Sequence, residues 1–556
     1  MDPTQLLTTP QPEPGTMGRG KGGGAIRIDE LEAIDADSVG LLDADQGGFG
    51  TNMWQGTRRS LIERLLPKIP APLSSPVIRD LALRLLLSSA TAPGADAGSG
   101  RARLSLVALR AHKLAALGDI GAVSSLLKLA SAQLDDEVMA RVQSDAAFLG
   151  NDNSGACTQI RGLIRQFQGP YWQKGLVFCQ ALAGQHAVAA LGADLLREQG
   201  HQDDQAFFIL LKSLVGDKSA VVGNLTNPTP LHLAMMRAAR QQLPVDVVTS
   251  KNAAILRTVA LSPNASMDVR LAAAEQAEAI GALETKALAK LYASINFTPE
   301  QLSNALSGAE SDTSARGRSL LYNATHIVTA PLARAEILQK AWTLAAKSQN
   351  YGTSVRIHLP VLLEIEPAPE LAWFAIPAAR ALLATGRTSE AAVWLGLSPD
   401  KVSEDDANQR RGLGLLVRLG NLEDTQPWDA AVLKTWWQSQ NKAGAGPARR
   451  RAAVLFTILE AFDQSLDPAL WEPLFEGPRS ETMTMPAPAL LHGLGRAAAA
   501  GRIGETVLLT LLSLGEGDLS QASPSVLGAA IRALRLVALE KEARALALEA
   551  AFGAGI

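Results

Sequence analysis

The chain has 556 residues, too many for one compact core, so several domains or an extended repeat array are expected. Hydrophobic residues make up 47% of it but aromatic residues only 4%, so Ala, Leu and Val supply most of the apolar mass. Because Ala and Leu favour helices and alternating β-branched runs are nearly absent, this composition predicts an all-α fold. The 52 basic and 55 acidic residues give a net charge of −3, which argues against nucleic acid as a partner.

Residues 1–49 are expected to form a leader without a core of its own. Residues 1–27 are rich in Pro, Gly and Thr, and such a composition predicts disorder. Residues 28–45 are acidic with interleaved aliphatic side chains, so we expect this segment to dock on the chain itself or on a partner. The start of the chain lacks the basic-then-apolar layout of a signal peptide, and no apolar run is long enough to predict a membrane-spanning segment.

Glycine recurs where an apolar helical pattern stops and the next one starts. A glycine after a helix adopts the left-handed conformation that closes the last turn, so each of these sites predicts the bend of a helical hairpin. The series predicts a superhelical α-solenoid of antiparallel hairpins over residues 50–440, a linker at 441–447 and a C-terminal helical block over 448–556. The six glycines are Gly118, Gly184, Gly281, Gly386, Gly420 and Gly501.

Two of these turns resemble those of tetratricopeptide repeat proteins. The spacing from Gly386 to Gly420 matches the period of that family, which is about 34 residues. Ala391 follows Gly386 at the fifth position, and Ala189 follows Gly184 in the same way, as in the family's turn. The resemblance extends to the other turns only through their spacing, and it implies a superhelix that binds proteins or peptides.

The two cysteines are placed symmetrically about a predicted turn. Gln168 stands midway between Cys157 and Cys179 in the sequence. Helices predicted over 156–167 and 171–183 would fold back and place the two cysteines within reach of a disulfide. The alternative is a pair of buried thiols on packed helix faces. A disulfide favours an oxidising compartment such as the periplasm, and free thiols favour the cytoplasm.

The stretch from Cys157 to Glu198 resembles uncharacterised exported helical proteins of bacteria. The residues that carry this resemblance are Tyr171-Trp172-Gln173-Lys174 and Phe178-Cys179-Gln180-Ala181-Leu182-Ala183-Gly184. The resemblance implies a periplasmic protein whose leader is not part of this chain.

No strong motif for catalysis, cofactors or metals occurs. The seven histidines are scattered, and neither H-E-x-x-H nor C-x-x-C is present, so no metal site is expected. The acidic run at 43–48 does not complete a calcium loop, because Trp54 stands where the bidentate glutamate belongs. Without a phosphate-binding glycine loop or a G-x-S-x-G elbow, we expect no cofactor and no enzymatic activity.

One pair of residues favours an alternative function. Glu310-Ser311 resembles the catalytic Glu-Ser pair of lytic transglycosylases, which also contain a helical superhelix. This resemblance implies a superhelical protein associated with cell-envelope polysaccharide (peptidoglycan) metabolism. The main prediction is a non-enzymatic scaffold that binds a protein or peptide in the bacterial cell envelope.

A cluster of tryptophans is the predicted partner-binding surface. Trp428, Trp436 and Trp437 precede the predicted linker. Side chains of adjacent helix residues point about 100° apart, so at least one indole of the Trp436–Trp437 pair is expected at the surface. The alternative is that the C-terminal block folds back over both of them.

Overall fold

The computed structural model is helical wherever it describes regular structure. It describes residues 35–96, 104–130, 136–399, 401–421, 428–440, 445–476, 485–515 and 519–556. Within these ranges no β-strand forms, and Leu42 and Ser88 make an isolated parallel bridge. The all-α prediction is confirmed, whereas most of the predicted leader, residues 1–34, lies outside the described residues.

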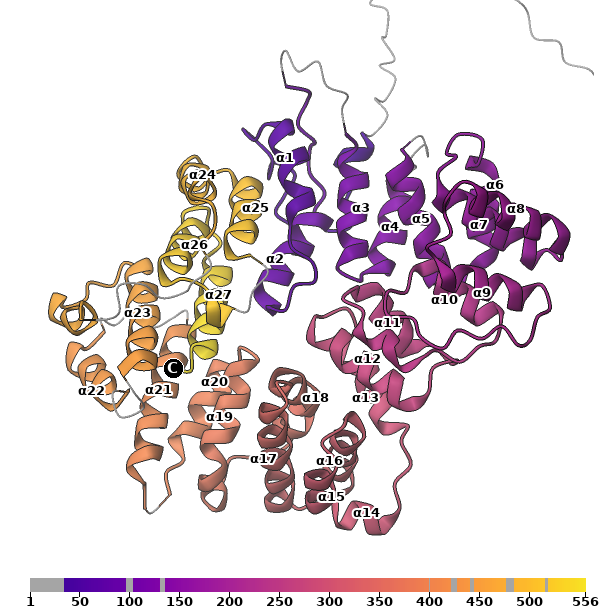
Figure 1. Cartoon of the computed structure of the whole chain (residues 1–556). Coiled ribbons are helices and arrows are strands. Elements are labelled where there is room, and N and C mark those ends of the chain that lie inside the picture. Colours follow the sequence, from indigo (N-terminus) through magenta and orange to yellow (C-terminus); the bar gives the residue numbers. More distant parts are fainter. Residues whose placement is uncertain are drawn as a thin grey trace, which may run out of the picture. The chain divides into compact units, whose positions relative to one another are not determined.

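The α-helices follow one another along the chain (Figure 1). The first nine are α1 (Arg59–Leu65), α2 (Pro76–Leu87), α3 (Leu106–Ala116), α4 (Ile120–Ala130), α5 (Glu137–Leu149), α6 (Asn153–Leu163), α7 (Pro170–Leu182), α8 (His186–Glu198) and α9 (Gln205–Leu214). The next nine are α10 (Pro230–Ala238), α11 (Ala253–Leu261), α12 (Met267–Ala279), α13 (Thr285–Ala293), α14 (Pro299–Ser303), α15 (Ala305–Ser311), α16 (Ala315–Ile327), α17 (Pro331–Lys347) and α18 (Tyr351–Leu363). The last nine are α19 (Ala375–Ala384), α20 (Thr388–Gly396), α21 (Glu404–Gly420), α22 (Ala430–Gln440), α23 (Ala445–Ala461), α24 (Pro488–Ala499), α25 (Ile503–Leu514), α26 (Pro524–Leu536) and α27 (Glu540–Gly553).

Short 3₁₀ helices punctuate the connections. They are η1 (Ala36–Ser38), η2 (Leu66–Lys68), η3 (Val245–Thr249), η4 (Pro369–Phe374), η6 (Pro468–Leu470), η7 (Glu472–Leu474) and η8 (Leu519–Gln521).

Short polar side chains fix many of the helix starts. Ser75 accepts a hydrogen bond from the amide of Ile78, and Asp136 accepts from the amides of Val138 and Met139. These contacts satisfy amides that have no partner within the helix. Many consecutive helices also pack against each other as pairs, among them α3 with α4, α7 with α8, α11 with α12, α17 with α18, α19 with α20 and α24 with α25.

Five of the six glycines of the series have the expected left-handed backbone. They are Gly118, Gly184, Gly281, Gly386 and Gly501, with φ angles between 66° and 85°. Gly420 ends α21 as predicted, but its φ is not positive, so the expected left-handed turn is wrong there. A Cβ atom at Gly420 would lie 2.3 Å from Cγ2 of Thr388, which shows that this glycine permits close packing of the chain.

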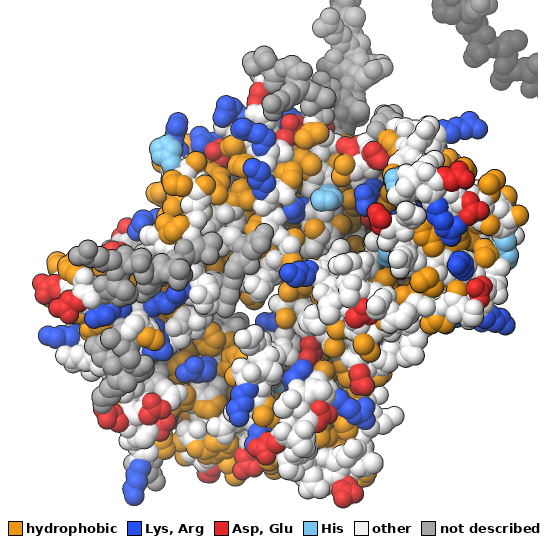
Figure 2. All heavy atoms as spheres, viewed as in Figure 1, with side chains coloured by type: hydrophobic (Ala, Val, Ile, Leu, Met, Phe, Trp, Pro, Cys, Tyr) orange, Lys and Arg blue, Asp and Glu red, His pale blue; other side chains and the backbone are white. Residues whose placement is uncertain are grey.

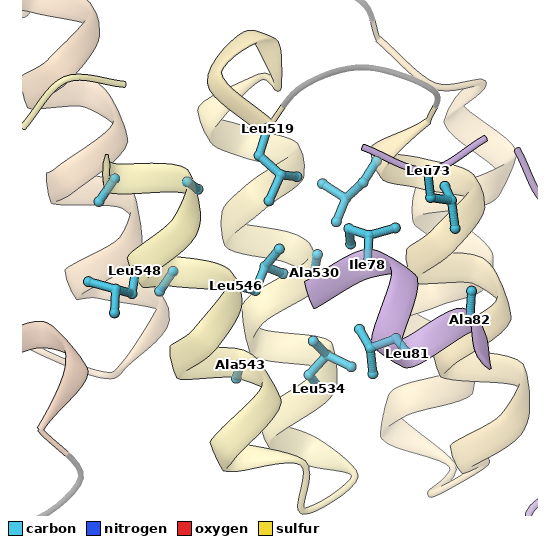
Figure 3. Packing of buried hydrophobic residues seen from close by; sticks show 14 of the residues in the cluster. Leu73, Ile78, Leu81, Ala82, Leu519, Ala530, Leu534, Ala543, Leu546 and Leu548 are labelled. Atoms are coloured by element: carbon cyan, nitrogen blue, oxygen red, sulfur yellow. The ribbon is translucent and has the colours of Figure 1, made fainter. Parts of the chain in front are cut away.

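Helix α2 joins the beginning of the described chain to its end. It packs against α25 and α27 as well as against its neighbour α3 (Figure 1). Figure 3 shows Ile78 and Leu81 of α2 pointing toward Leu534 of α26 and Leu546 of α27. These side chains are buried and belong to one continuous hydrophobic cluster.

Two polar contacts reinforce this junction. Arg84 of α2 donates to Glu542 of α27 at 2.5 Å, and the amide of Val77 donates to Glu549 at 3.1 Å. A carboxylate beside the first amides of α2 is also favoured by the helix dipole.

Residues 36–556 pack as one compact unit. The described part of the predicted docking segment binds its own chain, since Asp37 accepts a hydrogen bond from the buried Arg59 at 2.5 Å. Residues 441–444 of the predicted linker lie outside the described residues, and α23 begins at Ala445. The boundaries between the proposed solenoid, linker and C-terminal block stay predictions.

A substitution at Gly504 tests the contact of α25 with Met53 and Trp54. Its amide donates to the carbonyl of Met53 at 2.9 Å, and a Cβ atom there would lie 2.8 Å from the ring of Trp54. We expect Gly504→Ala to lower the free energy of unfolding by about 1–3 kcal/mol through overpacking, as measured by chemical denaturation. Gly495→Ala in α24 is the control, because a Cβ atom there meets open space and alanine favours a helix. Equal stability of the two variants would contradict the close contact.

Candidate functional site

A groove lies between the segment 43–56 and the turn that joins α24 to α25. Its volume is about 880 Å³, within the range of ligand sites. One wall carries Asp43, Asp45, Phe49, Thr51, Asn52 and Gln55, and the other is formed by residues 500–503. The two walls come from segments that are far apart in the sequence, so only folding brings them together.

The first wall is held in place by backbone hydrogen bonds to the segment after α2. The amides of Leu41 and Leu42 donate to the carbonyl of Leu87, and the amide of Ser89 donates back to Leu42 at 2.8 Å. The amide of Phe49 donates to Oγ of Ser88 at 2.9 Å. These contacts anchor the irregular segment on the helical core.

Arg84 connects this wall to α27. Its Nε donates to the carbonyl of Gly47 at 2.6 Å, and its guanidinium lies 4.6 Å from the centre of the Phe49 ring. The same guanidinium donates to Glu542. The junction between α2 and α27 therefore positions the groove as well as the core.

The second wall is built around Arg502. Its guanidinium donates to both carboxylate oxygens of Glu505, at 2.8 and 3.2 Å. Glu505 is itself buried, so the ion pair fixes the direction of the arginine side chain.

Several groove side chains make no hydrogen bond with the described residues. Asp45, Thr51, Asn52 and Gln55 are exposed, and their polar atoms remain available to a ligand. Asp43 accepts a hydrogen bond from the amide of Gln46 at 2.8 Å. The groove thus offers uncharged donors and acceptors beside two carboxylates, and its described lining contains no histidine, cysteine or tyrosine.

Two clusters of charged side chains among the described residues are held by internal contacts. Asp204 accepts from Lys174 at 2.8 Å and pairs with Nε2 of His232 at 2.9 Å. Burial alone would raise the pKa of Asp204, but His232 and Lys174 together lower it below its usual range. Nδ1 of His232 accepts from the amide of Thr229 in a capping box, so this histidine has no free nitrogen for general-base chemistry.

A second cluster lies among α12, α13 and α16. Arg318 donates to both oxygens of Glu275, at 2.8 and 2.6 Å, and the hydroxyl of Tyr292 donates to the same carboxylate. Burial, followed by the charge of Glu275, raises the pKa of Tyr292 well above its usual value. Each of these groups is hydrogen-bonded to another member of the cluster.

The Glu310-Ser311 pair lacks the environment of a catalytic acid. Glu310 is exposed and forms an ion pair with Lys340. The hydrogen bond from Lys340 lowers the pKa of Glu310, whereas a general acid at neutral pH needs a raised pKa. Asp145 has a pKa raised to about 6 by burial, but it accepts a hydrogen bond from Tyr171 and lies outside the groove.

The two cysteines form the predicted disulfide across α6 and α7. Their Cα atoms are 5.5 Å apart, and both residues are buried. The helices begin and end within a few residues of the predicted bounds, with Gly169 capping the start of α7. Of the two alternatives that the sequence left open, the structure has the disulfide.

The expected exposure of the paired tryptophans is wrong. Trp436 is 0% exposed and Trp437 is 6% exposed. Helix α22 packs against α21 and α23, so both directions in which the indoles point are covered. Trp428 is partly buried, with the guanidinium of Arg418 4.3 Å from its ring centre. The paired indoles therefore offer no exposed surface to a partner.

Within the described ranges, no group of three or more His, Cys, Asp and Glu side chains could hold a metal ion. None of the described helices is long and apolar enough to cross a bilayer. Comparisons with protein-family models, curated proteins and solved structures find no match to this chain. The site must therefore be interpreted from its own chemistry.

The sequence did not point to the groove. A signal was present in the glycines at positions 47, 48, 50 and 56, three of which have positive φ angles and shape the turns of the first wall. The second wall could not be assigned to it from sequence, because nothing local to Arg502 indicates which distant segment it faces.

Removal of the disulfide tests its contribution to stability. In the chain-entropy model, a closed loop spanning 22 residues contributes about 3 kcal/mol. We expect the double variant Cys157→Ala/Cys179→Ala to unfold at lower denaturant concentration and to lose amide protection in α6 and α7 during hydrogen exchange. A reductant should shift the wild type toward the variant and leave the variant unchanged. No effect of reductant on the wild type would contradict a stabilising bridge.

The pH dependence of stability tests the effect of burial on His358. Burial lowers its pKa to about 4, while the unfolded chain has the ordinary value of about 6.5. The unfolded state therefore binds the proton more readily, and stability present above pH ~6.5 is lost as the pH falls toward 4. For this group alone the expected loss between pH 7 and 5 is about 2 kcal/mol.

The matched variant is His358→Asn, which keeps a donor near the position of Nδ1 and cannot gain a charge. In the wild type the Nδ1 atom lies 2.7 Å from the carbonyl of Ser354. Chemical denaturation at pH 7 and pH 5 should show a smaller acid-induced loss for the variant than for the wild type. The same loss in both proteins would show that His358 does not titrate as described.

Proposed function

We propose that this protein is a non-enzymatic scaffold that binds an extended polypeptide segment in the groove between residues 43–56 and 500–503. The observation that carries the proposal is the set of unpaired hydrogen-bonding side chains at Asp45, Thr51, Asn52 and Gln55. Such side chains can pair with the amide groups of a peptide backbone. The described lining of the groove holds no nucleophile–base pair, which supports binding over turnover.

The charge of the groove favours a basic ligand. Asp43 and Asp45 are exposed carboxylates, and the single cation of the described lining, Arg502, is already paired with Glu505. Phe49 supplies the aromatic ring of that lining, but it is buried and lies beneath Arg84, so it offers little face to a sugar ring. We therefore favour a segment with lysine or arginine side chains over a glycan.

We further propose a superhelical arrangement of helical hairpins as the framework for this groove, as in the tetratricopeptide family. The pairwise packing of consecutive helices and the left-handed glycines at five turns support it. The buried disulfide supports a protein that works in an oxidising compartment, such as the bacterial periplasm.

A photo-crosslinking amino acid at Gln55 tests the site. With a library of extended peptides, we expect products enriched in Lys and Arg at Gln55 and none at the exposed control position Gln199. Asp45→Asn should weaken binding of the selected peptides about three- to tenfold, as expected for loss of one exposed charge pair. The matched control Asp203→Asn removes an exposed carboxylate elsewhere and should leave affinity unchanged.

Incubation with purified peptidoglycan tests the alternative function, a role in cell-envelope polysaccharide metabolism. We expect no release of soluble fragments by the wild type. If the wild type releases fragments and Glu310→Gln does not, the protein is an enzyme of cell-envelope polysaccharide and the scaffold proposal is wrong. If Gln55 crosslinks to a glycan, the proposal that the groove binds a peptide is wrong.

A further inference from the structure

The Nε2 atom of His358 is buried and has no hydrogen-bond partner among the described residues. The other ring nitrogen, Nδ1, lies 2.7 Å from the carbonyl oxygen of Ser354. Because a carbonyl oxygen can only accept, the neutral ring carries its proton on Nδ1 and has a lone pair on Nε2. A buried acceptor without a donor is costly, so a donor is expected within reach of Nε2.

His358 lines a small cavity where α18 packs against α13, α16 and α17. The volume of the cavity is about 10 Å³, which is the space that one water molecule needs. Three further polar side chains line it, namely Tyr292 of α13, Arg318 of α16, and Asn350, which precedes α18. Since Nδ1 is bonded back to α18 itself, Nε2 is the ring nitrogen that is turned toward these neighbours.

The neighbouring polar groups can make further hydrogen bonds. The hydroxyl of Tyr292 donates its single hydrogen to Glu275, so its oxygen can still accept. Arg318 uses three of its five N–H groups, two in hydrogen bonds to Glu275 and one in a hydrogen bond to the carbonyl of Thr313. The side chain of Asn350 does not cap the helix that follows it. The cavity therefore offers both donors and acceptors.

We propose that this cavity binds one structural water molecule, which donates a hydrogen bond to Nε2 of His358 and accepts one from Arg318. The second hydrogen of the water is donated to the hydroxyl oxygen of Tyr292. The water then makes three hydrogen bonds, the typical number for buried water in proteins. It connects His358 to the cluster of Glu275, Arg318 and Tyr292, and so completes a polar network that joins α12, α13, α16 and α18.

The chemistry of the cavity favours water over other occupants. A cation would lie beside the guanidinium of Arg318, and an anion would face the lone pair of Nε2. An apolar occupant would leave Nε2 without a donor. Figure 2 shows charged side chains of both signs on the surface where Figure 1 places α16 to α18, whereas His358 and Tyr292, each 2% exposed, lie beneath that surface. The cavity is separate from the groove, so this inference does not rest on the proposed function.

A high-resolution crystal structure of the full chain tests the water directly. We expect electron density for one ordered water within hydrogen-bond distance of Nε2 of His358 and of Arg318. NMR of isotope-labelled histidine at neutral pH should show the His358 ring protonated at Nδ1, with His358→Asn used to assign the signal. A cavity without density, an Asn350 side chain that donates directly to Nε2, or a ring protonated at Nε2 overturns the proposal.

A double-mutant cycle measured by chemical denaturation tests the link between His358 and Tyr292. Both rings lie beside that of Tyr322, with 5.8 and 5.6 Å between ring centres. Because either change removes a partner of the water, we expect the effects of His358→Asn and Tyr292→Phe on the unfolding equilibrium constant to be non-additive by about three- to tenfold.

The matched control is Tyr322→Phe, which keeps the ring and removes a hydroxyl that does not line the cavity. Its effect should be additive with that of His358→Asn. Additive effects of His358→Asn and Tyr292→Phe, or equal coupling of His358→Asn to the control, overturn the link through water. If Tyr292→Phe does not fold, the crystal structure of the wild type decides the question.

Discussion

The packing of α2 against α25 and α27 is the contact on which the rest of the structure depends. It joins residues near the start of the described chain to its last helix, and the hydrophobic cluster at this junction includes both Phe49 and Ile556. Arg84 adds the polar part, since it contacts Glu542 and also holds Gly47 and the Phe49 ring. Arg84 therefore contacts both the junction between α2 and α27 and the first wall of the groove.

Other buried arginines have a comparable role in holding irregular segments. Arg110 is fully enclosed and donates to the carbonyls of Leu86, Val39 and Ser88. Burial lowers its pKa to about 10, so the guanidinium remains charged at neutral pH. Arg79 of α2 donates to the carbonyl of Ile280 at 2.6 Å, which satisfies a carbonyl at the end of α12. These guanidinium groups give hydrogen-bond partners to backbone carbonyls that have none in a regular helix. In the same way, the half-buried Asp204 and the buried His232 are hydrogen-bonded to structural partners. The polar side chains of the groove, by contrast, are exposed.

The sequence determined the features that depend on local chain geometry. Composition and helical periodicity predicted the all-α fold, and the glycine pattern predicted six left-handed turns, of which five are present. Both predictions follow from backbone preferences within a few residues. The disulfide between Cys157 and Cys179 was also predictable, since the two helices that carry it are adjacent and their lengths fix the register. Gly420 differs because its small size serves a contact with Thr388, which local sequence does not encode.

Only the tertiary structure decided which faces of the helices are covered. Trp436 and Trp437 diverge on α22 as helical geometry requires, yet packing of α21 and α23 on that helix buries both. The apolar side chains of Val188, Leu191 and Leu195 on α8 have the opposite outcome and are exposed, while the next helix, α9, packs against α10 and α7. The groove likewise needs two segments that are far apart in the chain. Burial is a property of long-range contacts, and an amphipathic pattern specifies that a face prefers to be covered without specifying what covers it.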